Sequence, residues 1–352
     1  MKKVLFLIAG LISSLASIAQ QNVKVKTVYL KDGTSVNFEK ADVDSSRVVF
    51  TPDGDSLGIK VYVSGLSHDY LYSQINYVVF FGIDTTINEN KNTATDLAKN
   101  NEGWRLEFPK FYQGTDTTFE ITHSTDEYGI TYSLEWDGVK KANRWTCYEL
   151  YEGNMQSNVS RVDDFQIDPD IPEEYQHTLA DYSGSGFSRG HLCPSADRLC
   201  SSEQNAQTFY LSNMQPQWQN HNGVLWSNME THVRDIAANY DTLYVVKAAT
   251  IDNEDQIYTD IEVQAIDSAS NFPGIVPRYF YMALMGYNKQ TDSYTAIAYW
   301  TEHTNTSINT TDFSSYTITI DELEEKTGID FFCNLPDEIE EQVEATVELS
   351  NW

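Results

Sequence analysis

The chain has 352 residues and carries 52 acidic side chains against 23 lysines and arginines, so its formal net charge at pH 7 is −29. This charge excludes proteins that coat nucleic acids through a broad basic surface, but not a site where a few arginines and a metal bind one phosphate. The length suffices for one large domain or for two.

The first 19 residues have the pattern of a secretory signal peptide. Two lysines precede an apolar run, and Ser17-Ile18-Ala19 offers small residues at a cleavage point. A membrane anchor is the alternative, but the run is short for a bilayer span and contains Gly10. We expect residues 1–19 to be removed and the mature protein to be exported, to the periplasm or the extracellular space, without a membrane span.

Residues 22–84 are predicted to form a small β-rich module. The stretch VKVKTVYLKDGTSVNFEKADVDSSRVVF alternates apolar and polar residues and is broken by Asp32-Gly33, a pair typical of hairpin turns. The module contains no grouping of catalytic side chains, so we expect a structural or interaction domain. Residues 85–101, TTINENKNTATDLAKNN, are polar and lack apolar periodicity, which predicts a linker.

Residues 102–352 are rich in aromatic side chains and are predicted to form one larger α+β domain. Five segments rich in β-branched and aromatic residues are expected to be strands: GITYSLEW, TFYLSNM, DTLYVVKAAT, RYFYMALMGY and SYTAIAYW. Between the second and third, an apolar stripe at helical spacing predicts a helix: Leu225, Met229, Val233 and Ile236. A second stripe of the same helix steps by four residues: Asn222, Trp226 and Glu230.

The four cysteines are an even number in a chain expected to be exported, which favours two disulfides. Spacing does not fix the pairing. We favour Cys193–Cys200, which closes a short loop, with Cys147–Cys333 joining distant segments. Buried free thiols are the alternative. No two cysteines have the C-x₂₋₄-C spacing of a zinc site.

The stretch GFSRGHLCPSADR, residues 186–198, contains two overlapping motifs. One is G-x-S-x-G, in which Ser188 would be the nucleophile of a serine hydrolase. Such a serine needs a buried strand before it and a helix after it, yet a polar loop precedes Ser188 and Pro194 interrupts the segment after it. We therefore favour the second motif, in which His191 lies beside the phosphate-binding side chain of Arg189.

The surrounding residue types suit chemistry on a phosphate. A histidine such as His191 acts as a general base near neutral pH. The guanidinium groups of Arg189 and Arg161 can bind phosphate oxygens. Asn222 opens the predicted helix and Glu230 lies two turns along it, so they present the oxygen ligands that Mg²⁺ prefers.

SRGHLCPSADR, followed by NMQPQWQNHNGVLWSNME, resembles the ββα-metal DNA/RNA non-specific endonucleases, a family that includes secreted bacterial nucleases and mitochondrial endonuclease G. The family signature is D-R-G-H, then N-x-x-P-Q, then N-x₃-W-x₃-E. Six positions match it in identity and spacing: Asn213, Pro216, Gln217, Asn222, Trp226 and Glu230. The resemblance covers roughly residues 104–350 and implies a ββα-metal nuclease fold with a central antiparallel sheet and flanking helices.

The resemblance also implies roles for individual residues. His191 resembles the general base, and Asn222 the direct ligand of Mg²⁺, with Mn²⁺ as the alternative metal. Glu230 matches the acid that orients a metal-bound water. Asn213 and Arg189 match residues that shape the site and bind phosphate, and Arg161 is the candidate second arginine. The first position of the signature departs from the family, because Ser188 stands where aspartate is usual and brings no negative charge.

These observations predict a secreted, Mg²⁺-dependent endonuclease of DNA, RNA or both, with little sequence specificity because its contacts are to the backbone. In the implied mechanism His191 takes a proton from the attacking water, and the products carry 5′-phosphates. The alternative is a degenerate nuclease fold that binds nucleic acid or another partner without cleaving it. Retention of His191, Asn222 and Glu230 favours an active enzyme.

Overall fold

The computed structural model describes residues 24–50, 56–81, 87–349 and 352, and the chain divides into two compact units, Met1–Thr86 and Ile87–Trp352. The signal peptide predicted over residues 1–19 lies outside the described residues.

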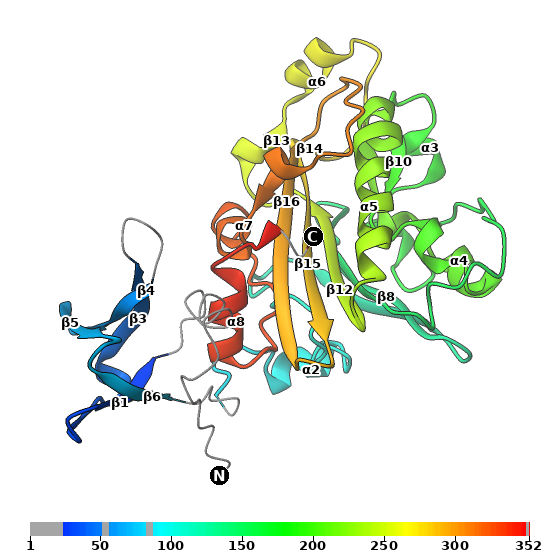
Figure 1. The fold of residues 1–352 in the computed structure, drawn as a ribbon. Helices are drawn as coiled ribbons and strands as arrows, with labels where there is room; N and C mark the ends of the chain where they lie inside the picture. Colours follow the sequence, from blue (N-terminus) through cyan, green and yellow to red (C-terminus); the bar gives the residue numbers. More distant parts are fainter. Residues whose placement is uncertain (1–23, 51–55, 82–86, 350–351) are drawn as a thin grey trace. The chain divides into compact units, whose positions relative to one another are not determined.

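The first unit contains two small antiparallel sheets (Figure 1). One has the order β2-β1-β6, from β1 (Val25–Leu30), β2 (Ser35–Asn37) and β6 (Ile75–Phe80). The other has the order β3-β4-β5, from β3 (Val43–Phe50), β4 (Ser56–Val63) and β5 (Leu66–Leu71). The turn expected at Asp32-Gly33 joins β1 to β2. There Gly33 takes a positive φ of 87°, which favours glycine, and Asp32 Oδ1 accepts from the Thr34 backbone N–H.

The second unit is built on a seven-stranded antiparallel sheet, which confirms the predicted α+β class. Its order is β17-β16-β15-β12-β9-β8-β7. The strands are β7 (Thr118–Thr125), β8 (Gly129–Asp137), β9 (Ala142–Leu150), β12 (Thr242–Ala249), β15 (Tyr279–Asn288), β16 (Ser293–Glu302) and β17 (Thr317–Ile318). Four of the five segments predicted as strands supply β8, β12, β15 and β16.

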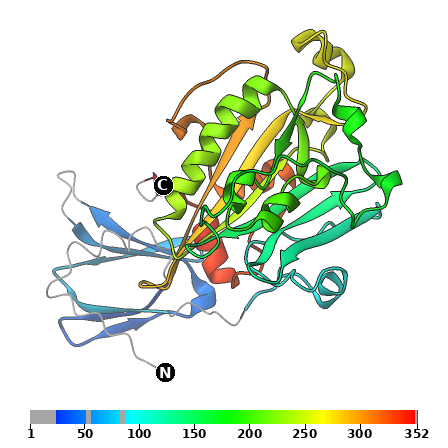
Figure 2. The ribbon, with the colours of Figure 1, turned by 90° about the vertical axis from the view of Figure 1, so that its right-hand side faces the viewer.

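Helices cover both faces of this sheet (Figures 1 and 2). Because side chains of a strand alternate between faces, Val245 of β12 joins the apolar cluster that contains Met229 and Val233 of α5 (Ser227–Ala237). Val246, the next residue, joins the cluster on the other face. That cluster includes residues of α7 (Ile320–Thr327) and α8 (Asp337–Glu344). We call the two sides the α5 face and the α7/α8 face.

Shorter elements complete the unit. The helices are α2 (Ala94–Lys99), α3 (Leu179–Tyr182), α4 (Ser202–Gln207) and α6 (Asp260–Ile266). The strands are β10 (Ser188–His191), β11 (Met214–Gln217), β13 (Ile257–Tyr258) and β14 (Val276–Pro277).

The segment TFYLSNM is the one predicted strand that the structure contradicts. Most of it is a turn and a short 3₁₀ helix, Leu211–Asn213, and extended structure begins only at Met214. The side chain of Asn213 bonds to three backbone groups, which bends the chain at this point.

Residues 87–101 are part of the larger unit rather than the predicted linker. Helix α2 begins with a capping box between Thr93 and Asp96. The buried Asn92 side chain donates to Gly103 O and Pro109 O and accepts from the Phe111 N–H. A polar sequence therefore packs here through its own amide side chains.

The predicted disulfides are also absent. All four cysteines, Cys147, Cys193, Cys200 and Cys333, are buried free thiols in the structure. The Cys200 thiol donates to Gln204 Oε1 at 3.1 Å, and Cys147 and Cys193 belong to apolar clusters on opposite faces of the sheet. The thiols therefore pack as small apolar side chains.

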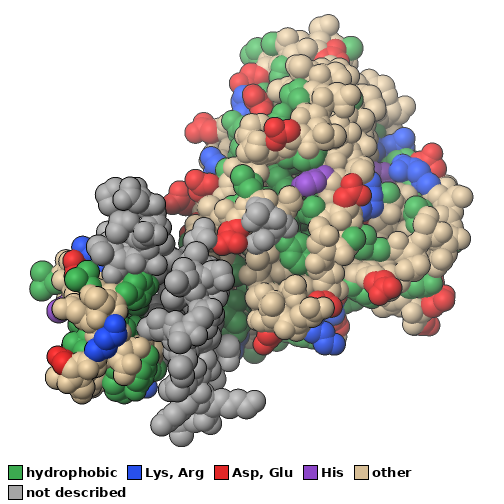
Figure 3. Space-filling model, in the orientation of Figure 1, with side chains coloured by type: hydrophobic (Ala, Val, Ile, Leu, Met, Phe, Trp, Pro, Cys, Tyr) green, Lys and Arg blue, Asp and Glu red, His purple; other side chains and the backbone are tan. Residues whose placement is uncertain are grey.

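Acidic side chains are scattered over the face of the larger unit seen in Figure 3, in keeping with the net charge of −29. Among the described residues, no helix is both long enough and apolar enough to cross a bilayer. Because the net charge is strongly negative, an anionic ligand must be held by cations concentrated at one place.

We expect Asn92→Ala to lower the stability of the larger unit by about 2–3 kcal/mol, because the buried Pro109 O and Phe111 N–H lose their partner, while Gly103 O keeps the Asn334 amide. Calorimetry on the full chain should show the melting temperature of that unit lowered by several degrees. Lys91→Ala, which changes an exposed neighbour, should leave it unchanged. Equal melting of the two variants would mean that residues 87–101 contribute nothing to the unit.

Candidate active site

Two sequence motifs meet where β10 pairs with β11 in antiparallel register. Arg189 lies opposite Pro216, and His191 opposite Met214. A Cβ at Gly190 would lie 2.0 Å from Gln217 Oε1 and 2.9 Å from Gln217 Cβ, so any other residue here would force the buried Gln217 side chain to shift. The strand pair thus brings Arg189 and His191 against the segment Met214–Gln217.

Asn213 holds this arrangement from behind. Its buried side chain accepts from the Cys193 N–H at 2.8 Å and donates to Cys193 O at 2.8 Å and Thr208 O at 2.9 Å. Asn213 does not line the cavity described below. Asn213 is therefore the one predicted site residue that shapes the site without facing the cavity.

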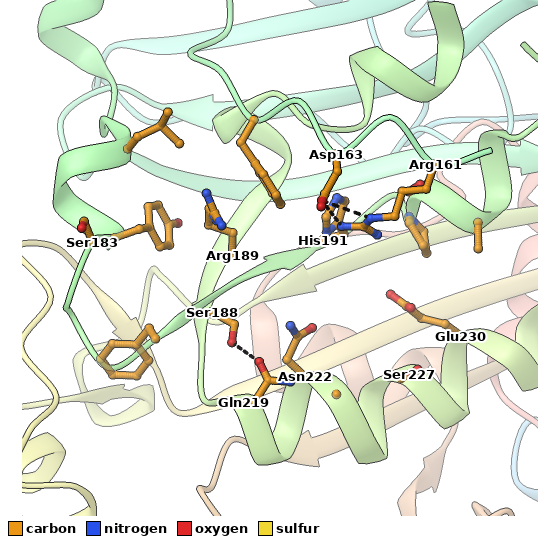
Figure 4. A pocket seen from close by; sticks show the side chains of 18 of the residues that line it. Arg161, Asp163, Ser183, Ser188, Arg189, His191, Gln219, Asn222, Ser227 and Glu230 are labelled. Atoms are coloured by element: carbon orange, nitrogen blue, oxygen red, sulfur yellow. Dashed lines mark hydrogen bonds and ion pairs between the residues drawn. The ribbon is translucent and has the colours of Figure 1, made fainter. Parts of the chain in front are cut away.

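A helical segment supplies the opposite wall. One turn of π-helix, η5 (His221–Trp226), runs directly into α5. The Trp226 indole N–H donates to His191 O at 3.3 Å, which fixes the helix against β10. Asn222 and Glu230, both half-buried, project from this segment toward the strand that carries His191 (Figure 4).

An open cavity of about 900 Å³ lies between these walls. Five of the six predicted site residues line it: Arg161, Arg189, His191, Asn222 and Glu230. Ser188 and Arg234 line it as well. The structure thus gathers residues that lie up to 73 positions apart in the sequence, from 161 to 234, around one space.

His191 is a neutral base with a free nitrogen. Within the described part of the chain, its Nε2 atom is buried and has no hydrogen-bond partner. Burial and, to a smaller extent, the positive charges of Arg161 and Arg189 together lower the pKa of His191 to about 3. The imidazole therefore stays unprotonated at neutral pH and can accept a proton.

Two phenylalanine rings place the arginines beside this histidine. The Arg189 guanidinium carbon lies 3.7 Å from the centre of the Phe165 ring, and that of Arg161 lies 4.7 Å from the centre of the Phe209 ring. Both rings also contact His191, with ring centres 5.7 Å and 5.1 Å away. Arg161 pairs with Asp163 at 3.1 Å, whereas the guanidinium of Arg189 has no acceptor among the described residues.

Sequence reasoning missed the charged groups that surround Glu230. Asp197 accepts from Arg234 Nη1 at 3.0 Å and from the Tyr148 hydroxyl at 2.8 Å. The pKa of Glu230 is raised to about 7, mainly by burial and also by Asp197, although Lys247, Arg234 and Arg161 oppose the rise.

Lys247 is the most unusual member of this group. It is fully buried, and its Nζ atom has no hydrogen-bond partner among the described residues. It lies between the apolar residues Val245 and Ala249 of the α5 face. In the sequence, the position of this lysine inside the apolar stretch LYVVKAA could have indicated that it is buried. The spacing of four residues from Glu230 could have indicated that Arg234 lies beside it on the helix.

Ser188 has no geometry for a hydrolase nucleophile. Its hydroxyl donates to Gln219 Oε1 at 2.6 Å, and it makes no hydrogen bond to His191 in the described structure. A strained turn leading into a helix, which such a nucleophile requires, is replaced here by the strand β10.

The donor set of the cavity fits a hard divalent cation. Asn222 offers a neutral amide oxygen that bonds to no described residue. Glu230 offers a carboxylate whose pKa is raised by burial, so a nearby cation would favour its charged form. His123, Asp168 and Asp170 form a second group of close ligand atoms. There His123 Nε2 is already bonded to Asp168 at 2.9 Å, and none of the three lines the cavity.

Comparison with known proteins identifies relatives of this chain. Residues 114–338 match the family model described as DNA/RNA non-specific endonuclease. The mitochondrial nuclease EXOG of Xenopus laevis is 28% identical over 222 residues, covering 62% of this chain and 61% of that protein. A nuclease of Nostoc sp. is 29% identical over 227 residues, covering 62% of this chain and 76% of that protein.

Human mitochondrial endonuclease G is 34% identical over 116 residues, which cover 33% of this chain and 39% of that protein. The match therefore spans less than two thirds of several relatives. Among solved structures, one of an EndoG/EndoGI complex superposes with a TM-score of 0.50 at 23% identity, covering 64% of this chain and 89% of that one. This likeness supports the fold.

We expect the His191 imidazole to remain neutral from pH 8 down to about pH 4, because its pKa is lowered to about 3. Replacing Arg189 with Gln removes one of the charges that lower this pKa, so the value should rise. Nitrogen NMR of the imidazole, assigned with His191→Asn, measures both. A midpoint near 6.5 in the unaltered protein would contradict the lowered pKa of His191.

Proposed function

Because the chain belongs to the DNA/RNA non-specific endonuclease family, we propose that it is an exported, metal-dependent endonuclease that hydrolyses phosphodiester bonds of DNA, RNA or both. The observation that carries the proposal is the buried Nε2 of His191, which has no hydrogen-bond partner among the described residues and lies beside two arginines at the cavity wall. Export rests on the signal-peptide pattern of residues 1–19.

Asn222 and Glu230 are the residues that we propose hold the metal, which is Mg²⁺ with Mn²⁺ as the alternative. The oxygen donors of this pair suit such ions. When bound, the ion supplies stabilisation of the charge that develops on the phosphoryl and leaving oxygens. Asn222 would bind it directly, and Glu230 through water.

The protein's own groups carry the rest of the mechanism. His191 Nε2 accepts a proton from the attacking water, which its lowered pKa allows at neutral pH. Arg189 and Arg161 bind the phosphate oxygens through their guanidinium groups. The aromatic rings beneath both arginines limit their movement, so the cations are already placed when the substrate arrives.

The cavity is lined by groups that suit a phosphate and its metal rather than a base edge. Contacts of this kind fix the position of the nucleic acid without reading its sequence. We therefore propose slight sequence preference. Ser188, where the family usually has aspartate, contributes no charge and donates its hydroxyl to Gln219.

A degenerate fold that binds nucleic acid without cleaving it is the competing function. Such a protein has no need of a buried, neutral histidine beside a pair of metal-binding side chains. The joint presence of His191, Asn222 and Glu230 at one cavity favours catalysis.

His191→Ala should reduce cleavage by roughly 10²–10⁴-fold, the usual cost of losing a general base. Ser188→Ala should cost far less, because its hydroxyl contacts only Gln219 among the described residues. The measurement is the initial rate of plasmid nicking at fixed Mg²⁺, with the melting temperature of each variant as the control for folding. Near-normal turnover in His191→Ala would overturn the mechanism.

Chelation of divalent metal should abolish nicking, and added Mg²⁺ should restore it. Asn222→Ala should raise the Mg²⁺ concentration for half-maximal rate by more than the about 10–100-fold typical for loss of a residue that orients a metal ligand. Asn239→Ala, exposed just beyond the end of α5, is the matched control. Metal-independent nicking by the purified protein would refute the proposal, as would an unchanged Mg²⁺ requirement in Asn222→Ala.

A further inference from the structure

Three carboxylates converge between α7 and α8, on the face of the sheet opposite α5. Asp321 and Glu324 lie about one turn apart on α7, and Glu344 is the last residue of α8. One oxygen from each lies within 4.8 Å of the others. The apolar side chains of the two helices pack into the core of the same face, so the carboxylates are held by the fold.

Glu344 is the member that points to a missing ligand. The residue is 6% exposed, and its Oε1 atom has no hydrogen-bond partner in the described structure. A buried carboxylate oxygen without a partner is costly and therefore rare. Among the described residues, no lysine, arginine or histidine forms an ion pair with Asp321, Glu324 or Glu344.

The neighbouring acids show what a satisfied group looks like here. The Asn90 amide donates to Glu340 Oε1 at 2.9 Å and to Asp330 Oδ2 at 3.3 Å. Glu324 accepts from the Phe331 N–H through Oε1 at 2.7 Å. Burial, together with the neighbouring acids Glu324 and Glu340, raises the pKa of Glu344 to about 10. Glu344 therefore requires either a proton or a cation.

The oxygens lie within 4.8 Å of one another, a separation that one calcium ion can bridge. Calcium binds oxygens at 2.3–2.6 Å, so two ligands of one ion lie at most about 5 Å apart. Mg²⁺ needs shorter bonds in strict octahedral order and keeps most of its water. Asp321 is exposed, so an ion can enter from solvent and keep water ligands on that side.

We propose that Asp321, Glu324 and Glu344 form a Ca²⁺ site that fastens the end of α8 to α7. The site lies across the sheet from the cavity that contains Asn222 and Glu230, so it is structural. It is also independent of the proposed endonuclease activity. Extracellular calcium modules bind with dissociation constants of about 10⁻⁴–10⁻³ M, and we expect this range here.

The test uses the full chain carrying Asn222→Ala, which weakens the proposed catalytic metal site, after removal of metal by chelation. Calorimetry should show that Ca²⁺ raises the melting temperature of the larger unit by several degrees, saturating in the millimolar range. Equilibrium dialysis with radioactive calcium should give one ion per chain.

Two variants locate the site. Glu344→Gln keeps the shape of the side chain and should lose both the shift and the bound ion. Asp321→Asn alters an exposed ligand without threatening the core and should weaken binding by at least tenfold. Glu341→Gln, on the exposed side of α8, removes the same charge and should behave like the parent chain.

Three results would overturn the proposal. In the first, Ca²⁺ produces no shift in the parent chain. In the second, Glu344→Gln stabilises the protein equally with and without Ca²⁺, which identifies Glu344 as a buried protonated acid. In the third, Mg²⁺ matches Ca²⁺ at equal concentration, which removes the basis for a calcium site.

Discussion

The antiparallel pairing of β10 with β11 is the interaction on which the candidate site depends. It fixes His191 opposite Met214, and a slip of one residue would turn the imidazole to the other side of the strand. Gln217, at the far end of the pair, bonds through its side chain to His221 at the start of the helical segment. Because Trp226 of that segment bonds back to His191 O, strand and helix form a closed loop of contacts around the cavity.

The electrostatics of the cavity follow from the same arrangement. A chain with a net charge of −29 repels polyanions at long range, and screening limits that repulsion to about 10 Å at 0.1 M salt. Attraction must come from Arg161 and Arg189, which rest on Phe209 and Phe165. These arginines also lower the pKa of His191. The groups suited to a phosphate are thus the groups that keep the base unprotonated.

The sequence was most informative where a motif depends on local spacing. The four-residue steps from Asn222 to Glu230 predicted one helical wall, and Asn222 and Glu230 do line the cavity, whereas Trp226 between them is buried in the core. The apolar strands of the central sheet were equally visible, because alternation is a local property. Local spacing could not show that Asn92 is buried by contacts near residue 103, or that polar residues 87–101 join the larger unit.

Other errors have a similar physical origin. Counting cysteines presumes that thiols meet, whereas all four are buried free thiols here and Cys200, predicted to pair with Cys193, donates to Gln204 instead. The segment containing Asn213 has strand-like composition, but its side-chain hydrogen bonds bend the backbone. Lys247 was overlooked because a single cation in a strand has no periodicity. The negative charges that act on it, Glu230 and Asp197, are distant in sequence.

The two faces of the sheet solve the problem of buried charge in different ways. On the α5 face, Lys247 and Arg234 offset Asp197 and Glu230, so positive charge is built into the fold. On the α7/α8 face, Glu344 is surrounded by other acids and has no cationic partner among the described residues. A buried carboxylate is stable only when it is paired or protonated. On the α5 face the chain itself supplies the cations that offset the buried acids. On the α7/α8 face Glu344 needs a proton or a metal ion from solution.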